Sequence, residues 1–140
     1  MDLERRFQIA ALALKKLEDE HSSFMRSVSD LKQAEIPGAE LRVNDNELQA
    51  TCLGVMLTAK HRPIARNGEI ELLEYQFAYR QGEKLVTIWR VFLSDGHLYE
   101  DVDLKNFICQ SSNGYLPSRL APYLGAALLQ SALFAPGSDG

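Results

Sequence analysis

Apolar residues in the first quarter of the chain recur in alternating steps of four and three. Residues 2–33 contain neither proline nor glycine and are rich in alanine, leucine, lysine, glutamate and arginine, a composition that favours a helix. The spacing is that of an a/d heptad seam, and we expect Ile36-Pro37-Gly38 to end the helix. The members of this heptad seam are Leu3, Phe7, Ala10, Leu14, Leu17, His21, Phe24, Val28 and Leu31.

His21 is the only polar member of the heptad seam, and three interpretations of it are open. In the first, the helix breaks at His21-Ser22-Ser23, because serine is a poor residue in a helix interior. In the second, the helix is continuous and forms a homodimer interface in which His21 sets the register. In the third, His21 is a proton switch that opens the closed seam when it is charged. The residues predicted to meet a second copy are Phe7, Leu14, Leu17, His21 and Phe24.

From Ala39 to about Asp103 the hydrophobic period changes to two, which predicts an antiparallel meander of about five strands. The segment ELRVNDNELQATC indicates two strands joined by a turn at residues 44–46. KHRPIARNGE contains a proline and an Asn67-Gly68 turn, and therefore predicts an exposed connection. HLYEDV is the last predicted strand.

The segment KLVTIWRVFL is apolar on both faces, as expected of a central strand covered on both sides. Alternation puts Leu85, Thr87 and Trp89 on one face, with Arg90 on the other. A charge at Arg90 needs a partner, and a glutamate on the neighbouring strand, Glu71 or Glu74, is the simplest one. The strand before it, ELLEYQFAYR, gathers its apolar residues on one face: Leu73, Tyr75, Phe77 and Tyr79.

The C-terminal part of the chain is predicted to be helical again. LKNFICQ indicates a short helical turn capped by Asp103, and the segment Pro117–Phe134 indicates an apolar helix that is buried in the fold or in a partner. We expect one α+β domain over residues 1–135 and a disordered tail at 136–140.

Composition argues against several classes of function, among them nucleic-acid binding, membrane insertion and metal binding. The chain has 140 residues, a formal charge of -4 and a pI of about 5.4, so its balance disfavours broad nucleic-acid binding. An N-terminus without a continuous apolar stretch predicts no signal peptide, and no run is long enough to span a membrane, so we expect a cytoplasmic protein. Cys52 and Cys109 are far apart and indicate buried thiols rather than a metal site or a disulfide. We predict no metal and no cofactor.

Two groups of residues are candidates for ligand or partner binding. Arg62 and Arg66, with Lys60 and His61, form the densest basic stretch, which could grip phosphate or acidic groups or simply be a solvated loop. The aromatic face that includes Tyr75, Tyr79 and Trp89, with Arg90 nearby, could line a pocket or pack as core.

The sequence contains no phosphate-binding loop and no nucleophile or metalloprotease motif, and we assign no catalytic residue. The leading hypothesis is therefore a small cytosolic, non-catalytic binding or adaptor protein that acts through protein–protein contacts as a homodimer. Secretion chaperones, immunity proteins and inhibitors are the class-level analogies for this size and acidity. The alternative is a small-molecule-binding domain or enzyme with a pocket between the sheet and the helices.

Overall fold

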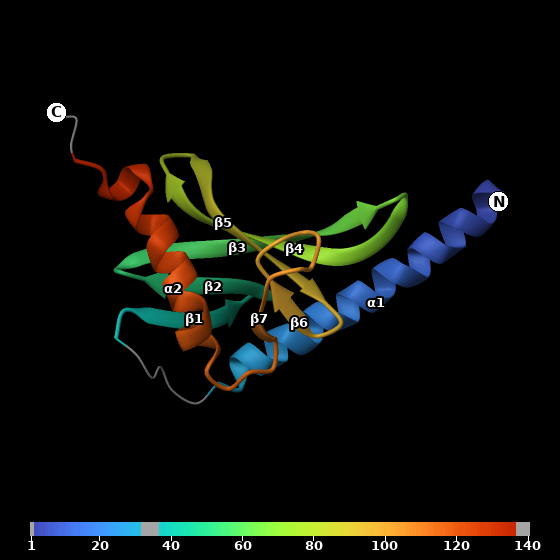
Figure 1. Ribbon diagram of the computed structural model, residues 1–140, viewed down its shortest axis with the longest axis horizontal. Helices are drawn as coiled ribbons and strands as arrows, with labels where there is room; N and C mark the ends of the chain where they lie inside the picture. Colours follow the sequence, from blue (N-terminus) through green and yellow to red (C-terminus); the bar gives the residue numbers. More distant parts are fainter. Residues whose placement is uncertain (1, 32–36, 137–140) are drawn as a thin grey trace.

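The chain folds as α+β, with a long N-terminal helix, an antiparallel sheet and a C-terminal helix (Figure 1). The computed structural model describes residues 2–31 and 37–136. The predicted fold class is confirmed, with seven strands in place of about five. The elements are α1 (Leu3–Ser29), β1 (Ala39–Asn44), β2 (Glu47–Cys52), β3 (Val55–Arg66), β4 (Glu69–Gln81), β5 (Lys84–Ser94), β6 (His97–Tyr99), β7 (Phe107–Gln110), α2 (Leu116–Leu129) and a 3-10 helix (Ala132–Phe134).

α1 is one continuous helix, so the first of the three interpretations of His21, a break at His21-Ser22-Ser23, is wrong. The helix starts at Asp2, whose carboxylate accepts a hydrogen bond of 2.7 Å from the backbone N–H of Arg5. Ser22 and Ser23 are exposed, and their low helix propensity is a small cost beside the packing of the buried side of the helix. Residues 32 and 33, the end of the predicted helix, lie outside the described residues.

The strands form a simple meander in which each pairs with the next one along the chain. Tight two-residue turns join β1 through β6, and the predicted left-handed residues Asp45 and Asn46 have φ of 53° and 62°. Of the predicted exposed connection at residues 60–69, residues 60–66 are instead the second half of β3, whereas the predicted Asn67-Gly68 turn is present. Pro63 fits there because β2 pairs with β3 only as far as Ala59, so its missing N–H faces an open strand edge.

Two other predicted elements differ from the structure at the C-terminal side. The segment LKNFICQ is predicted to be a helical turn, but its residues 107–110 form β7. They pair with β6, and the sheet overrides their local preference. The predicted helix Pro117–Phe134 stops at Leu129, and Ser131 then caps the 3-10 helix by accepting from the N–H of Leu133. Of the predicted tail, residues 137–140 lie outside the described residues.

A β-bulge changes the predicted faces of β5. Phe77 pairs with Trp89 but Ala78 pairs with Thr87, so Ile88 is an extra residue on β5. Val86 therefore lies on the same face as Trp89, and the prediction that Thr87 shares the face of Trp89 is wrong. Strict alternation along the sequence cannot predict this switch.

Both helices pack on the inner face of the curled sheet, and the core lies between the helices and the sheet (Figure 1). α1 lies against β4 and β1, while α2 lies against β5, β1, β7 and β2. Neither helix supplies residues to the outer face of β3 and β4, which carries Arg62 and Glu74. The fully buried side chains of the inner core include Phe24, Leu48, Leu57, Tyr75, Phe77, Val91, Leu93, Leu116, Leu120 and Leu128. Within the described residues, no helix combines the length and apolarity needed to cross a membrane.

Candidate functional site

His21 is buried in a polar cluster between α1 and the sheet. Its Nδ1 lies 2.7 Å from the hydroxyl oxygen of Tyr75 on β4, and its Nε2 lies 2.8 Å from the carbonyl oxygen of Asn46. Its ring also stacks on that of His61 on β3, with a centroid distance of 3.7 Å and an interplanar angle of 14°. Tyr75 and His61 are direct cross-strand partners, so the sheet register brings these groups together.

The two contacts of His21 fix the tautomer of a neutral ring. The carbonyl of Asn46 can only accept, so Nε2 carries the hydrogen and donates it. Nδ1 then accepts from the Tyr75 hydroxyl, which is itself fully buried and needs a partner. Neutral His21 therefore satisfies two polar groups at once, which explains a histidine in an otherwise apolar seam.

A cavity of about 340 Å³ opens beside this cluster. His61 keeps part of its ring exposed there, and burial of the rest lowers its pKa, as does the neighbouring His21, while Glu47 acts in the opposite direction. The cavity is thus a mixed polar and apolar niche at the edge of the core. Its lining comes from α1, the β1–β2 turn, β3 and β4: Leu14, Leu17, Glu18, His21, Ser22, Asn46, His61, Pro63 and Leu73.

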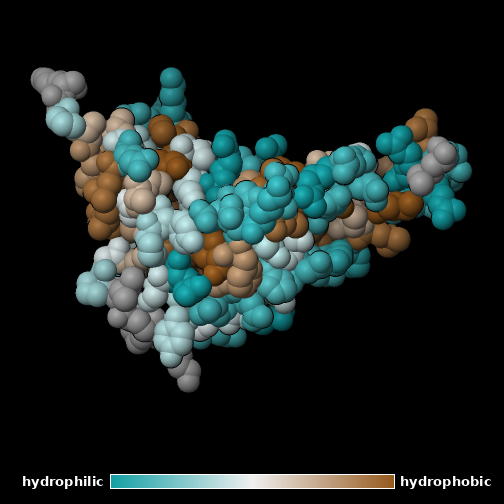
Figure 2. All heavy atoms as spheres, viewed as in Figure 1, coloured by the Kyte–Doolittle hydropathy of each residue, from teal (hydrophilic) through white to brown (hydrophobic). Residues whose placement is uncertain are grey.

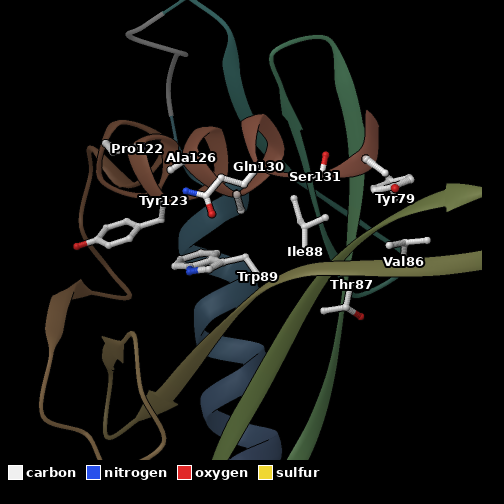
Figure 3. Close-up of a pocket in the computed structure, with 12 residues that line it drawn as sticks. Tyr79, Val86, Thr87, Ile88, Trp89, Pro122, Tyr123, Ala126, Gln130 and Ser131 are labelled. Carbon is white, nitrogen blue, oxygen red and sulfur yellow. The ribbon is translucent and has the colours of Figure 1, made fainter. Parts of the chain in front are cut away.

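A larger and more open groove of about 710 Å³ separates α2 from β5. Figure 3 shows Tyr123 and Gln130 on the α2 side, with Trp89, Ile88 and Val86 on β5. The rings of Trp89 and Tyr123 stack with a centroid distance of 5.4 Å. Among residues 2–31 and 37–136, no charged side chain lines this groove, so it suits an uncharged, largely apolar surface.

The six residues predicted to bind a ligand or partner fall on both sides of the sheet. Tyr75 is buried in the core, whereas Tyr79 and Trp89 line the groove beside α2. Arg90 lies on the opposite face, so the predicted pocket of these four residues is not one site. The prediction of a glutamate partner for Arg90 is correct, because its Nε lies 3.5 Å from Glu74.

Arg62 and Arg66 do not form a common basic loop. Arg62 donates from Nε to Glu74 at 2.7 Å, in the middle of the outer face. Arg66 is held at the end of the β3–β4 hairpin by Glu71 and by the carbonyl oxygen of Val102, at 2.6 Å and 3.0 Å. Only Arg62 thus joins Arg90 in a single cluster.

The five predicted dimer residues are also divided. Leu17, His21 and Phe24 are buried against the chain's own sheet and are not available to a second copy. Phe7 is 73% exposed and Leu14 is 36% exposed. Figure 2 shows hydrophobic side chains gathered at the N-terminal end of α1 and again over α2. Only the first half of the heptad seam is therefore open to a partner.

Both cysteines are buried free thiols, as the sequence predicts. Burial raises the pKa of Cys52 and of Cys109, and Arg119 offsets only part of the effect at Cys109. Raised thiol pKa values keep both groups protonated and poorly nucleophilic at neutral pH. Among the described residues, histidine, cysteine and acidic side chains form no group able to hold a metal ion.

The chain matches no family model, no curated protein and no solved structure.

Proposed function

We propose that this chain is a binding protein that works through protein–protein contacts and forms a homodimer through the first half of α1. The observation that supports the proposal is the exposed apolar stripe formed by Leu3, Phe7 and Leu14, which are 79%, 73% and 36% exposed. This half of α1 extends past the helix-covered core, with the tip of the β3–β4 hairpin beside it (Figure 1). An apolar stripe of this kind is costly in water and is typical of an interface.

A second copy of the same helix is the occupant that the pattern favours. In an antiparallel pair, a positions pack against d positions, which places Leu3 against Leu14 and Phe7 against Ala10 of the mate. The arrangement has two-fold symmetry, as most homodimers do.

The helix pair alone is too small for a stable interface. Residues 3–14 span only about 18 Å of helix, whereas stable interfaces bury on the order of 1,200 Å² or more. The neighbouring hairpin tip supplies further surface: Arg6, Ile9 and Ala13 of α1 share a cavity with Asn67 and Ile70. The proposed interface therefore includes α1 and the β3–β4 hairpin of both copies.

Absolute mass by light scattering on a sizing column tests the proposal. The wild-type chain should elute with twice its 15.7 kDa mass at about 100 µM, and Phe7→Glu should elute as a monomer because a charge is placed in the apolar stripe. Leu12→Glu is the matched control. Leu12 is equally exposed, at 71%, but lies about half a helical turn away from Leu3.

The control variant should remain a dimer. A wild-type monomer at this concentration would contradict the proposal, and so would a dimer that survives Phe7→Glu. Equal loss of the dimer in both variants would contradict an interface confined to the stripe of Leu3, Phe7 and Leu14.

A further inference from the structure

The outer face of the sheet holds a carboxylate buried beneath two arginines. Glu74 lies on β4, between Arg62 on β3 and Arg90 on β5, and its side chain is only 6% exposed. Its Oε1 accepts from Arg62 Nε at 2.7 Å and from Gln76 Nε2 at 2.6 Å, while its Oε2 faces Arg90 Nε at 3.5 Å. The arginine side chains themselves are 62% and 56% exposed. Each arginine side chain is thus paired with the buried carboxylate of Glu74, and more than half of its surface stays exposed to solvent.

The cluster has a surplus of positive charge. Burial by itself would raise the pKa of Glu74, but the hydrogen bonds from Arg62 and Gln76 and the charges of both arginines lower it on balance. Glu74 is therefore ionised at neutral pH and neutralises only one of the two guanidinium groups. Lys60, whose cross-strand partner Gln76 also pairs with Arg90, adds a third positive charge on this face. Glu100, which lines a cavity with Arg90, offsets one of these charges, and the group keeps a net positive charge although the whole chain carries a charge of -4.

The contacts with Glu74 use the Nε atoms of the arginines and leave their Nη groups for a ligand. Within residues 2–31 and 37–136, the Nη groups of Arg62 and Arg90 donate no hydrogen bond to another residue. Paired guanidinium N–H groups match the two oxygens of a carboxylate, which they can grip in a bidentate way. Because Glu74 fixes both guanidiniums, less side-chain entropy is lost when they bind a ligand.

We propose that Lys60, Arg62 and Arg90 form a docking surface for an extended, carboxylate-rich segment of a partner protein. Lys60 and Arg62 are two residues apart on one strand, so their side chains repeat at about 6.6 Å. Alternate side chains of an extended partner segment have the same spacing. A polyphosphate chain such as nucleic acid fits less well, because three positive side chains on an acidic molecule form a much smaller basic face than nucleic-acid binding needs. The inference does not depend on the α1 dimer, which uses another surface.

Fluorescence anisotropy with a labelled peptide of five Glu-Thr repeats tests this inference. At about 20 mM salt the wild-type chain should bind the peptide, and the affinity should fall steeply with added salt. Arg90→Gln should weaken binding about tenfold, the loss expected for one charge-assisted contact. It leaves the Arg62–Glu74 hydrogen bond in place, so the buried carboxylate keeps a partner. Arg26→Gln, which removes an exposed arginine of α1 on the other side of the sheet, is the matched control and should change the affinity less than about twofold.

Arg90→Lys separates a bidentate grip from simple charge. It keeps the positive charge but loses the fork, so its affinity should lie between those of the wild type and Arg90→Gln. Thermal unfolding of each variant verifies that it is folded before binding is measured. A peptide of five Gln-Thr repeats should not bind.

Several outcomes would overturn the inference. One is absence of binding at low salt, and another is equal affinity in Arg90→Gln and the wild type. Tighter binding of single-stranded oligothymidylate, or displacement of the peptide by millimolar inorganic phosphate, would replace the acidic protein segment by a phosphate ligand. Loss of the wild-type dimer mass in Arg90→Gln would make this surface an interface between copies. Failure of the α1 dimer alone would leave the peptide result unchanged.

Discussion

The two halves of α1 carry the same hydrophobic pattern and meet different surroundings. Leu3 and His21 are about five turns apart and therefore lie on the same side of the helix, yet Leu3 is 79% exposed and His21 only 3%. Phe7 and Met25 have the same separation, with exposures of 73% and 4%. A heptad pattern thus identifies which side of a helix is apolar, but not what covers that side.

The difference arises from where the sheet lies along α1. The second half of α1 packs across β4 and β1. Near its middle, Lys16 forms an ion pair of 3.0 Å with Asp95, and Glu20 accepts from the backbone N–H of Gly96, so the β5–β6 turn holds the helix there. In the described part of the chain, only the β3–β4 hairpin accompanies the helix beyond this point (Figure 1). The apolar stripe is therefore longer than the surface available to bury it within one chain.

The largest expected difference between the halves is in the free energy of unfolding. Phe24→Ala should lower it by about 3–5 kcal/mol, because Phe24 is fully buried and packs edge-on against Tyr75 at a centroid distance of 5.3 Å. Phe7→Ala should change it by less than about 0.5 kcal/mol. Urea unfolding at about 1 µM, where association is weak, measures both. A loss of several kcal/mol in Phe7→Ala would show that the first half is packed within the monomer.

The polar contact inside the buried half gives the next largest effect. His21→Leu should cost about 1–3 kcal/mol, since the buried Tyr75 hydroxyl loses its partner. Adding Tyr75→Phe should recover most of this loss, although Tyr75→Phe alone should be destabilising. A double-mutant cycle by urea unfolding measures the coupling. Additive losses would contradict a hydrogen bond between the two side chains.

The elements of this fold were predictable where local pattern and final environment agree. The long helix, the meander, the turn at Asp45-Asn46 and the apolar C-terminal helix all have strong local signals. The bulge at Ile88 has none, because it depends on the pairing of β4 with β5. Pro63 was misleading for a similar reason, since only the sheet topology shows that its strand edge is open.

The candidate sites show the same division. The pairing of Arg90 with Glu74 could be predicted, because a charge in a central strand requires an opposite charge on a neighbouring strand. The cluster of His21 and His61 could not, since the two residues are on different elements with no shared spacing. Nor could the sequence divide the heptad seam into a buried and an open half, because that depends on where the sheet ends.

The smallest of these effects is a slight decrease in the free energy of unfolding when the pH is lowered, which arises where the buried half of α1 meets His61. Burial, followed by the nearby His21, lowers the pKa of His61, so the folded state binds a proton less tightly than the unfolded state, whose histidine pKa is about 6.5. The stability is therefore complete above about pH 6.5, falls as the pH drops below that value, and levels off below the folded-state pKa. Partial exposure of the ring and the opposing charge of Glu47 limit the loss to under about 1 kcal/mol.

Urea unfolding of the wild type and of His61→Phe between pH 7.5 and 5 isolates this contribution. The phenyl ring preserves the stacking on His21 but cannot titrate, so its free energy of unfolding should fall less steeply over this range. The pKa of Glu20 is raised chiefly by burial, and as the pH falls its protonation changes stability in the opposite direction. That carboxyl is present in both proteins, so the difference between the two slopes reports His61 alone. Equal slopes would show that protonation of His61 does not loosen α1 from the sheet.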